Sequence, residues 1–503
     1  MDICFIYPPV SVRERYGLRK LGKVGGHLPP LGLAYLAAVC RTKGYHVSII
    51  DAPAIDASHQ DILAFLREEQ PAVVGLSAVT VVFHRAVILA EAIRRLFPDM
   101  LIVIGGHHAS IMPRQVIGET PHFDIAVYGE GEATMVEILA RYRDAGFCRD
   151  AFLADKSLCG ITGIAFRRGT DIVVTQPRQP IPSLDELPYP AWDLLSMDRY
   201  IPLPNQYVRK PVVHMVATRG CPYSCGFCSN NAVFGKQQRY LSPRRLIEQM
   251  DYVEERFGAR EISFWDDSMT TNRAWLEEFC RERIRTKRVL GWSCYSRVDT
   301  VDPAALGLMK QAGCWNIFYG FESGSQELLD GIDKRITIEQ IRQVTAWTKK
   351  AGIQIRASFM IALPKETPEL ARKTIDFAVS LDPDYAQFSV TTLFPQTKLW
   401  DEASRYGTVQ RDFSRYTLWD PVFIPWGYRD KAQIEEIERL AMRRFYLRPR
   451  YIWGRIRSIR SYEDIVRYLK GFLLLLGFLG FTRPVQKTAL VSSGGRRCSG
   501  NGI

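Results

Sequence analysis

The sequence lacks the segments that direct a protein into or across a membrane. The first residues, Met1–Pro9, carry an acid where a secretory signal needs a base, and two prolines end their short apolar run. The longest apolar run, Gly471–Phe481, would rise about 16 Å as a helix, roughly half of a bilayer core. The chain also has no evident internal repeat or low-complexity tract. We therefore expect a cytoplasmic protein.

The cysteines lack the regular spacing of a disulfide scaffold. Eleven are spread along 503 residues, and only three of them lie close together in the sequence. In a large cytoplasmic chain, clustered cysteines are more often metal ligands than disulfide partners. The spacing therefore indicates one metal site and assigns no chemistry to the other cysteines.

The composition excludes a disordered chain and a single small core. The chain is 47% hydrophobic and 24% charged, as in ordinary globular proteins, and its length suggests roughly two to four domains. The net charge of +12 is compatible with nucleic acid, an anionic membrane surface or anionic cofactors, and it does not choose among them. Seven arginines crowd just ahead of the apolar run, namely Arg443, Arg444, Arg448, Arg450, Arg455, Arg457 and Arg460.

Residues 1–145 alternate strands with helices. The apolar strand patterns, with helical periodicity between them, cover 3–7, 47–50, 72–76, 101–104 and 125–128. Such alternation predicts a doubly wound, Rossmann-like α/β domain, whose ligands sit at the carboxyl ends of parallel strands. No G-x-G-x-x-G sequence follows the first strand, so a bound dinucleotide is not expected.

A linker separates the first domain from a second α/β domain. Residues 146–205 form a proline-rich linker with a β-hairpin over 163–175. Residues 206–430 repeat the strand–helix alternation and predict a (β/α)6 partial TIM-type barrel, with its chemistry at the carboxyl ends of the strands. The expected strands are 212–217, 261–265, 291–295, 316–321, 354–361 and 385–393.

Residues 431–503 form a helical, basic and hydrophobic extension. A helix over 434–444 leads into the arginine-rich stretch and then into the apolar run. This pattern is typical of an interfacial membrane anchor or a substrate-access element, and equally of a helix packed on the barrel. The tail from Ser492 is rich in serine, glycine and arginine and is expected to be disordered.

Three cysteines at C-x-x-x-C-x-x-C spacing, Cys221, Cys225 and Cys228, lie on the loop after the first barrel strand. Three thiolates can bind three corners of a cubane 4Fe–4S cluster, and the fourth iron then stays open to chelate a small molecule. Glycines beside the first two cysteines let the backbone wrap around such a cluster. Zinc is the alternative, but it needs a fourth ligand, for which His214 is the only nearby candidate.

This cysteine sequence, with an aromatic residue before the last cysteine, resembles the radical S-adenosylmethionine superfamily. The resemblance covers roughly residues 205–400. It implies that the three cysteines ligate a 4Fe–4S cluster that binds S-adenosylmethionine, with Phe227 against the adenosine. The sequence after the second strand resembles the family's acidic turn, so Asp266 and Asp267 are expected to face the active site.

Later barrel strands extend the resemblance. The fourth strand ends in Glu322 and Ser323, which resemble the family's ribose- and methionine-binding region. The fifth strand leads to Pro364, in a segment similar to the adenine-side strand. Ala362 and Gln396 both stand where the family usually has glycine.

Small residues at the strand ends of the first domain resemble the cobalamin-binding half of the cobalamin-dependent radical S-adenosylmethionine subgroup. The resemblance implies that Ser77, Gly105 and Gly106 line the cavity for the nucleotide tail and that Gly129 and Glu130 belong to the same site. The D-x-H-x-x-G sequence of other corrinoid proteins is missing, so cobalt is expected without a protein histidine. The alternatives are a Rossmann-like domain without a cofactor and one that binds another nucleotide.

The resemblance implies an enzyme with three cofactors, namely a 4Fe–4S cluster, S-adenosylmethionine and cobalamin. The expected reaction is methyl transfer to an unactivated carbon. The basic, aromatic C-terminal region suggests a hydrophobic small-molecule substrate, such as a lipid, terpenoid or tetrapyrrole. Ring formation on a tetrapyrrole or hopanoid-type substrate is the nearest alternative.

An RNA-modifying methylthiotransferase is the alternative from another class. It would need further cysteines in the N-terminal domain for a second cluster, and Cys4 and Cys40 have no third partner there. No nucleic-acid partner is therefore expected. The expected partners are an electron donor such as flavodoxin or ferredoxin and, through residues 431–503, the inner face of the membrane.

Overall fold

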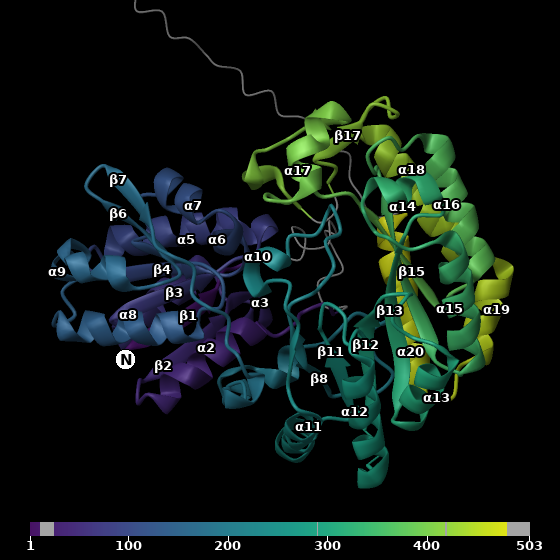
Figure 1. Cartoon of the computed structure of the whole chain (residues 1–503), viewed down its shortest axis with the longest axis horizontal. Helices are drawn as coiled ribbons and strands as arrows, with labels where there is room; N and C mark the ends of the chain where they lie inside the picture. Colours follow the sequence, from purple (N-terminus) through teal and green to yellow (C-terminus); the bar gives the residue numbers. More distant parts are fainter. Residues whose placement is uncertain (11–24, 289, 418–419, 480–503) are drawn as a thin grey trace, which may run out of the picture.

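The chain folds into two α/β domains that lie side by side, followed by C-terminal helices (Figure 1). The structure is a computed structural model that describes residues 1–10, 25–288, 290–417 and 420–479. The expected disorder from Ser492 onward lies outside the described residues.

The first domain contains a seven-stranded sheet in the order β2-β1-β3-β4-β5-β6-β7. The first five strands are parallel, as predicted for a doubly wound domain. The hairpin predicted over 163–175 forms β6 and β7, and it pairs antiparallel with β5 so that it extends this sheet. The strands are β1 (Ile3–Tyr7), β2 (Val47–Asp51), β3 (Val73–Ser77), β4 (Leu101–Gly105), β5 (Ile125–Val127), β6 (Ile164–Arg168) and β7 (Asp171–Val174).

Helices cover both faces of the first sheet because its strands are apolar on both faces. Along β1, Ile3 and Phe5 pack with one group of helices, and Cys4 and Ile6 pack with the other. Figure 1 shows α2 and α8 on one side and α5 and α7 on the other. The helices are α2 (Leu31–Thr42), α3 (Ala52–Ile55), α4 (His59–Glu69), α5 (Phe83–Leu96), α6 (His107–Ile111), α7 (Pro113–Glu119), α8 (Glu132–Asp144) and α9 (Arg149–Ala154).

The second domain contains six parallel strands in the order β15-β14-β13-β12-β11-β8. All six predicted strands are present, and the two edge strands do not pair, so the predicted partial barrel is confirmed. The strands are β8 (Val212–Met215), β11 (Glu261–Phe264), β12 (Gly291–Ser296), β13 (Cys314–Glu322), β14 (Gln354–Ile361) and β15 (Tyr385–Val390).

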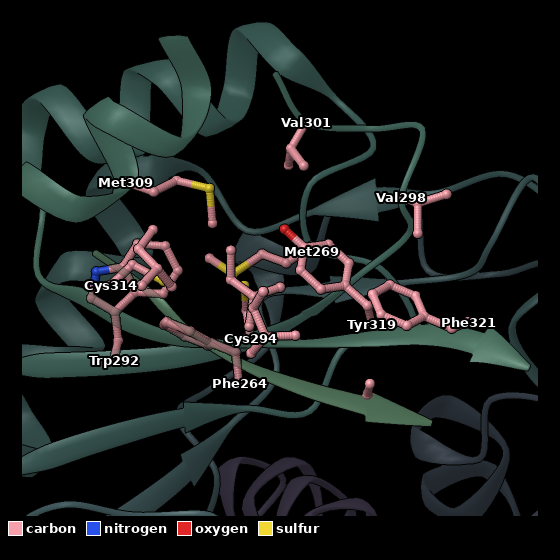
Figure 2. Close-up of a cluster of buried hydrophobic side chains, with 14 of the residues drawn as sticks. Phe264, Met269, Trp292, Cys294, Val298, Val301, Met309, Cys314, Tyr319 and Phe321 are labelled. Carbon is pink, nitrogen blue, oxygen red and sulfur yellow. The ribbon is translucent and has the colours of Figure 1, made fainter. Parts of the chain in front are cut away.

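One face of the barrel sheet packs against its helices. Phe264, Trp292 and Tyr319 lie in the cluster of buried apolar side chains on this face (Figure 2). Because side chains alternate along a strand, the intervening residues face the barrel lumen. The covering helices are α11 (Pro243–Phe257), α12 (Arg273–Thr286), α13 (Pro303–Gln311), α15 (Ile338–Lys350) and α16 (Pro368–Leu381).

Short elements surround the carboxyl ends of the barrel strands. They are β9 (Thr218–Arg219) with β10 (Arg239–Tyr240), α10 (Asn231–Phe234), α14 (Gln326–Gly331), α17 (Lys398–Glu402), and β16 (Gly407–Val409) with β17 (Phe423–Pro425). These elements hold the loops on which the predicted chemistry depends.

Three helices end the described chain, namely α18 (Lys431–Tyr446), α19 (Pro449–Arg457) and α20 (Tyr462–Phe478). The helix predicted over 434–444 is α18, which buries Ile434 and Phe445 against the barrel. In α20, Arg467 donates to the carbonyl of Tyr207, just before β8, at 2.6 Å. Within the described ranges, no helix combines the length and hydropathy needed to cross a membrane.

Candidate functional site

The three clustered cysteines lie on the loop that leaves the first barrel strand. Cys221 and Cys225 are partly exposed, Cys228 is exposed, and none of the three forms a disulfide. Burial raises the pKa of the Cys221 thiol, and the charges of Asp267 and Cys225 act in the same direction. The loop therefore presents accessible thiols at the carboxyl end of β8, where a barrel of this type places its chemistry.

Backbone geometry fixes the course of this loop. Gly220 has φ +91°, and a Cβ there would lie 2.4 Å from the carbonyl oxygen of Gln237. The amide of Gly226 donates to the carbonyl of Ile332 at 2.8 Å, and its carbonyl accepts from the amide of Leu399 at 2.8 Å. The loop is thus held by α14 and α17, and only glycine fits at position 220.

The donor set fits a cubane cluster better than a zinc ion. In the described part of the chain, no three His, Cys, Asp or Glu side chains are close enough to hold a single metal ion. Zinc needs four donors around one ion, whereas cysteines that bind a cubane contact different iron atoms and stand further apart. His214, the candidate fourth zinc ligand, is buried within β8.

Two cations beside the cysteine loop were not predicted from the sequence. Arg297 lies 3.6 Å from Sγ of Cys225, and its guanidinium carbon is 3.8 Å from the Tyr223 ring centroid. Lys334 lies 5.6 Å from the Phe227 ring centroid. Arg297 therefore places positive charge beside the Cys225 sulfur, whereas the charge of Lys334 is paired with Glu322. Neither residue leaves a signal in the cysteine sequence, because both belong to later segments of the chain.

The two carboxylates of the acidic turn after β11, Asp266 and Asp267, have different surroundings. Asp266 is buried and accepts from the amides of Ala217, at 2.9 Å, and Thr218, so it holds the start of the cysteine loop. Burial raises the pKa of Asp266 to about 7. Asp267 is exposed and accepts from the side-chain amide of Asn230. Of the two predicted carboxylates, Asp267 is therefore the one that lies open toward the cysteines.

The end of β13 carries the next predicted pair. Glu322 has φ +60° and forms a buried ion pair with Lys334 at 2.7 Å. Ser323 is buried, lies 3.2 Å from Oγ1 of Thr374 in α16 and accepts from the amide of Ser325. A left-handed backbone at a non-glycine residue persists only where the surrounding structure enforces it. This strand end is therefore rigidly built.

The predicted adenine-side segment and adenosine contact lie in one apolar group. Phe227 packs against Leu363, which directly precedes the buried Pro364. Ala362, where the family usually has glycine, has φ +63°. Its amide donates to Glu366 at 2.6 Å. The left-handed backbone gives the physical reason for glycine at this position.

The small residues of the first domain meet at the carboxyl edge of its sheet. Ser77 pairs with Gly105 across β3 and β4. Gly106 has φ +89°, and a Cβ there would lie 2.7 Å from Oγ of Ser77. The amide of Gly129 donates to Oγ of Ser110 at 3.1 Å. This edge keeps its backbone free of bulky side chains, as a site for a large flat cofactor requires.

Glu130, which was predicted to belong to the corrinoid site, forms ion pairs with arginines of the barrel domain. Its carboxylate lies 3.1 Å from Arg219 and 2.8 Å from Arg239, and it accepts from the amide of Ile181 at 2.7 Å. Arg219 also pairs with Glu132 at 2.6 Å. All four charged side chains are buried. The contacts join the first domain to the strand that leads into the cysteine loop.

The carboxyl edges of the two sheets face each other through further contacts. His107 of α6 lies 3.1 Å from Oγ of Ser229, the residue after the last clustered cysteine. Gln396, where the family usually has glycine, has φ +59° and donates to the carbonyl of Ile111. Sites at the two edges therefore border one shared space.

The N-terminal cysteines do not form a second cluster site. Cys4 packs on one face of the first sheet and Cys40 on the other. Burial raises the pKa of both thiols to about 12. This arrangement removes the feature that a methylthiotransferase would need.

Comparisons with known proteins agree with this geometry. Residues 20–139 match the B12 binding domain family, and residues 215–378 match the Radical SAM superfamily. The uncharacterised methyltransferase PH0819 of Pyrococcus horikoshii is 33% identical over 476 residues, which cover 94% of this chain and 98% of that protein. The chain belongs to the B12-binding radical S-adenosylmethionine enzymes. The predicted family is confirmed, and its cofactors are the 4Fe–4S cluster, S-adenosylmethionine and cobalamin that the sequence indicates.

The chain is also similar to a further sequence relative and to a solved structure. An anaerobic magnesium-protoporphyrin IX monomethyl ester cyclase of Rubrivivax gelatinosus is 29% identical over 480 residues, covering 92% of this chain and 84% of that protein. The structure of the radical S-adenosylmethionine methyltransferase TsrM from Kitasatospora setae superposes with a TM-score of 0.69 at 15% identity. It covers 96% of this chain and 100% of that one. The latter likeness concerns the fold.

Proposed function

We propose that this B12-binding radical S-adenosylmethionine enzyme is a C-methyltransferase that acts on an unactivated carbon of a small hydrophobic molecule. The observation that carries the proposal is that the carboxyl edges of the two sheets face each other. His107 contacts Ser229, and Glu130 pairs with Arg219, so a methyl carrier on one edge would stand opposite a radical source on the other. The likeness to the uncharacterised methyltransferase PH0819 over almost the whole chain supports it.

The residues divide the work as follows. Cys221, Cys225 and Cys228 would hold the iron–sulfur cluster, and Ser77 with the strand-end glycines would hold the corrinoid. When bound, these groups supply the electron that cleaves the sulfonium and the methyl group that is transferred. Buried groups at the domain boundary keep bulk water out of the space between the edges, because a carbon radical would otherwise be quenched.

The same site residues complete the proposal. Phe227 and Pro364 would contact the adenosine, and Asp267 would face the bound S-adenosylmethionine. Glu322 and Ser323 would shape the ribose and methionine side through their fixed strand end. Asp266 would position the cysteine loop, because it accepts hydrogen bonds from the amides of Ala217 and Thr218 at the start of that loop.

Replacement of the cysteine triad by alanine tests the radical step. The triple variant should lose the cluster absorbance and all S-adenosylmethionine cleavage after anaerobic reconstitution, because no other described cysteines share this loop. The matched control is Cys148→Ala, an exposed cysteine of the first domain, which should keep both. The readouts are the visible spectrum and the release of S-adenosylmethionine products. Cleavage by the triple variant would overturn the proposal.

Ring formation is a second candidate, favoured by the likeness to the Rubrivivax cyclase. The two reactions differ in the fate of the methyl group. If S-adenosylmethionine with a labelled methyl group is supplied, a methyltransferase places the label in the product, whereas a cyclase without methyl transfer does not. A labelled product supports methyl transfer, and an unlabelled cyclised product overturns it.

We further propose that flavodoxin or ferredoxin supplies the electron from the cytoplasmic side, and that nucleic acid is not a partner. The exposure of Cys228 supports an approach of the donor to the cysteine loop. The positive net charge favours acidic partners such as these carriers.

Membrane contact through α19 and α20 is also proposed. Four apolar side chains of these helices are each at least half exposed, namely Trp453, Ile456, Leu469 and Phe472. The exposed Arg450 precedes Trp453 in α19. Apolar side chains beside arginines suit the interface of an anionic bilayer.

Vesicle binding tests this contact. Leu469→Glu should reduce sedimentation of the protein with vesicles of anionic phosphatidylglycerol, because it places a charge in the apolar interface. Ile88→Glu, an exposed apolar position on α5, is the matched control and should bind as the natural protein does. Equal binding by both variants would contradict the contact.

A further inference from the structure

The lumen face of the barrel carries an unbroken belt of rings. Phe264, Cys294 and Tyr319 point to the helix side in Figure 2, so the residues next to them in the strands face the lumen. These are Trp265, Tyr295 and Phe318. Their ring centroids are 5.4 Å apart from Trp265 to Tyr295 and 5.0 Å from Tyr295 to Phe318.

Two polar side chains end the belt. On the β8 side, the ring of His214 lies 5.7 Å from that of Trp265. On the β14 side, the guanidinium carbon of Arg356 lies 4.8 Å from the Phe318 centroid and 5.7 Å from that of Tyr295. Four neighbouring strands contribute one member each, and Trp265 directly follows β11, which lies among them. The belt, defined as these five residues, thus extends from β8 to β14.

The polar end at His214 is buried without partners in the described part of the chain. His214 is 2% exposed, and neither of its ring nitrogens has a hydrogen-bond partner among the residues that the structure describes. Arg356 is 4% exposed, donates through Nε to Asn316 at 2.9 Å and interacts with the side chain of Tyr295, but it forms no salt bridge with any carboxylate that the structure describes. A buried cation that faces no described carboxylate, and a buried imidazole with no described partner, cost free energy that a ligand can recover.

The end of the belt formed by His214 and Trp265 opens into the space between the domains. A cavity of about 310 Å³ is lined by His214, Val216 and Trp265 from the barrel and by Tyr7 and residues 28–31 from the first domain. Burial and the charge of Arg356 lower the pKa of His214 to about 3, so the imidazole is neutral. A neutral imidazole offers one donor and one acceptor to a molecule in this cavity.

We propose that the belt is the substrate wall of the enzyme and that the substrate is a flat aromatic or conjugated molecule with a carboxylate. The ring system lies along Trp265, Tyr295 and Phe318, the carboxylate pairs with Arg356, and His214 hydrogen-bonds to a polar group on the opposite edge. This assignment rests on the proposed function. It narrows the proposed substrate class from hydrophobic small molecules to those that also carry a carboxylate. Stacking and a desolvated ion pair are the contacts that these side chains favour.

The first test uses 2-naphthoate and its uncharged methyl ester as probes, titrated calorimetrically into the full chain. The natural protein should bind the carboxylate at least about tenfold more tightly than the ester, because only the carboxylate pairs with Arg356. Arg356→Met should remove this preference, and Arg356→Lys should keep part of it. The matched control is Arg283→Met, a buried arginine of α12, which should leave the preference unchanged.

Two other variants test the belt if Arg356→Met does not fold. Trp265→Ala should weaken both probes by about fivefold without changing their ratio, because it removes stacking and leaves the charge. The hydroxyl of 6-hydroxy-2-naphthoate should add affinity that His214→Phe removes. A preference that survives in Arg356→Met, or a natural protein that binds neither probe, would overturn the proposal.

Titrations before and after reconstitution separate the two proposals. Probe binding requires no S-adenosylmethionine cleavage. If the radical assignment fails, cleavage is absent while the carboxylate preference persists. If the substrate assignment fails, the preference is absent while cleavage persists.

Discussion

Ala362 and Gln396 hold left-handed backbone without being glycine. Such a conformation costs an ordinary residue about 1–2 kcal/mol. Ala362 has φ +63° and donates its amide to Glu366, and Gln396 has φ +59° and uses its side chain to reach the carbonyl of Ile111. Each departure from the family's glycine thus comes with a compensating hydrogen bond. At Gln396 that bond also joins the two domains.

Glu366 makes stability depend on pH. Its carboxyl is fully buried, and burial raises its pKa from 4.5 to about 7. Between these values the folded protein holds a proton that the unfolded chain has released, so its contribution to stability falls as pH rises through this window. Glu366→Gln removes the titration. We expect the difference in unfolding temperature, variant minus natural protein, to increase as the pH is raised from about 5 to about 7. Above that pH the difference should be constant.

Differential scanning calorimetry at several pH values measures this difference. Subtracting the two midpoints cancels the titration of groups that the proteins share. A difference that stays constant across the window would show that Glu366 does not hold the proton.

At the scale of elements, the cysteine loop depends on its glycine. Gly220→Ala places a Cβ 2.4 Å from the carbonyl oxygen of Gln237, so the loop must move. Gly258→Ala is the control, because Gly258, at the end of α11, also has positive φ, +63°, but has open space around its Cβ position. After reconstitution, Gly220→Ala should retain little iron and Gly258→Ala most of it, with similar circular dichroism. Equal iron contents would refute the steric argument.

The barrel strands could be predicted because each is an apolar run bounded by polar residues or glycine. Strand β14 spans the predicted Gln354–Ile361, and the other five differ by a few residues at their ends. The place of β6 and β7 in the first sheet could not be predicted, because strand pairing is a contact between distant segments. Local patterns specify elements, and long-range contacts specify their neighbours.

The site follows the same rule. The cysteine triad is local in sequence and was identified from its spacing. Arg297 reaches Cys225 across 72 positions, and Arg219 reaches Glu130 across 89, so neither contact leaves a local pattern. The resemblance of the Gly129–Glu132 segment to the cobalamin subgroup assigns Glu130 to the corrinoid site, and its pairing with Arg219 and Arg239 is a long-range contact that this segment does not reveal.

At the scale of the molecule, Arg219 joins the domains. Arg219→Ala leaves Glu130 facing Arg239 alone and Glu132 buried without its ion-pair partner, which should cost about 3–5 kcal/mol. The control is Arg288→Ala, which removes a more exposed arginine that faces three carboxylates and should cost about 1 kcal/mol or less.

Calorimetry of the full chain checks this prediction. Loss of the interdomain pairs should split the unfolding of Arg219→Ala into two transitions, one for each domain, whereas Arg288→Ala should unfold like the natural protein. A single, unshifted transition in Arg219→Ala would contradict the role of the pairs.

The position of Arg219, two residues before Cys221, has a consequence for how the enzyme matures. If the two domains separate to admit a corrinoid, the ion pairs of Arg219 with Glu130 and Glu132 must lengthen or break. This would displace the strand that leads to the three cysteines. We therefore expect corrinoid uptake and cluster assembly to influence each other, so that the order in which the two cofactors are added changes the yield of active protein.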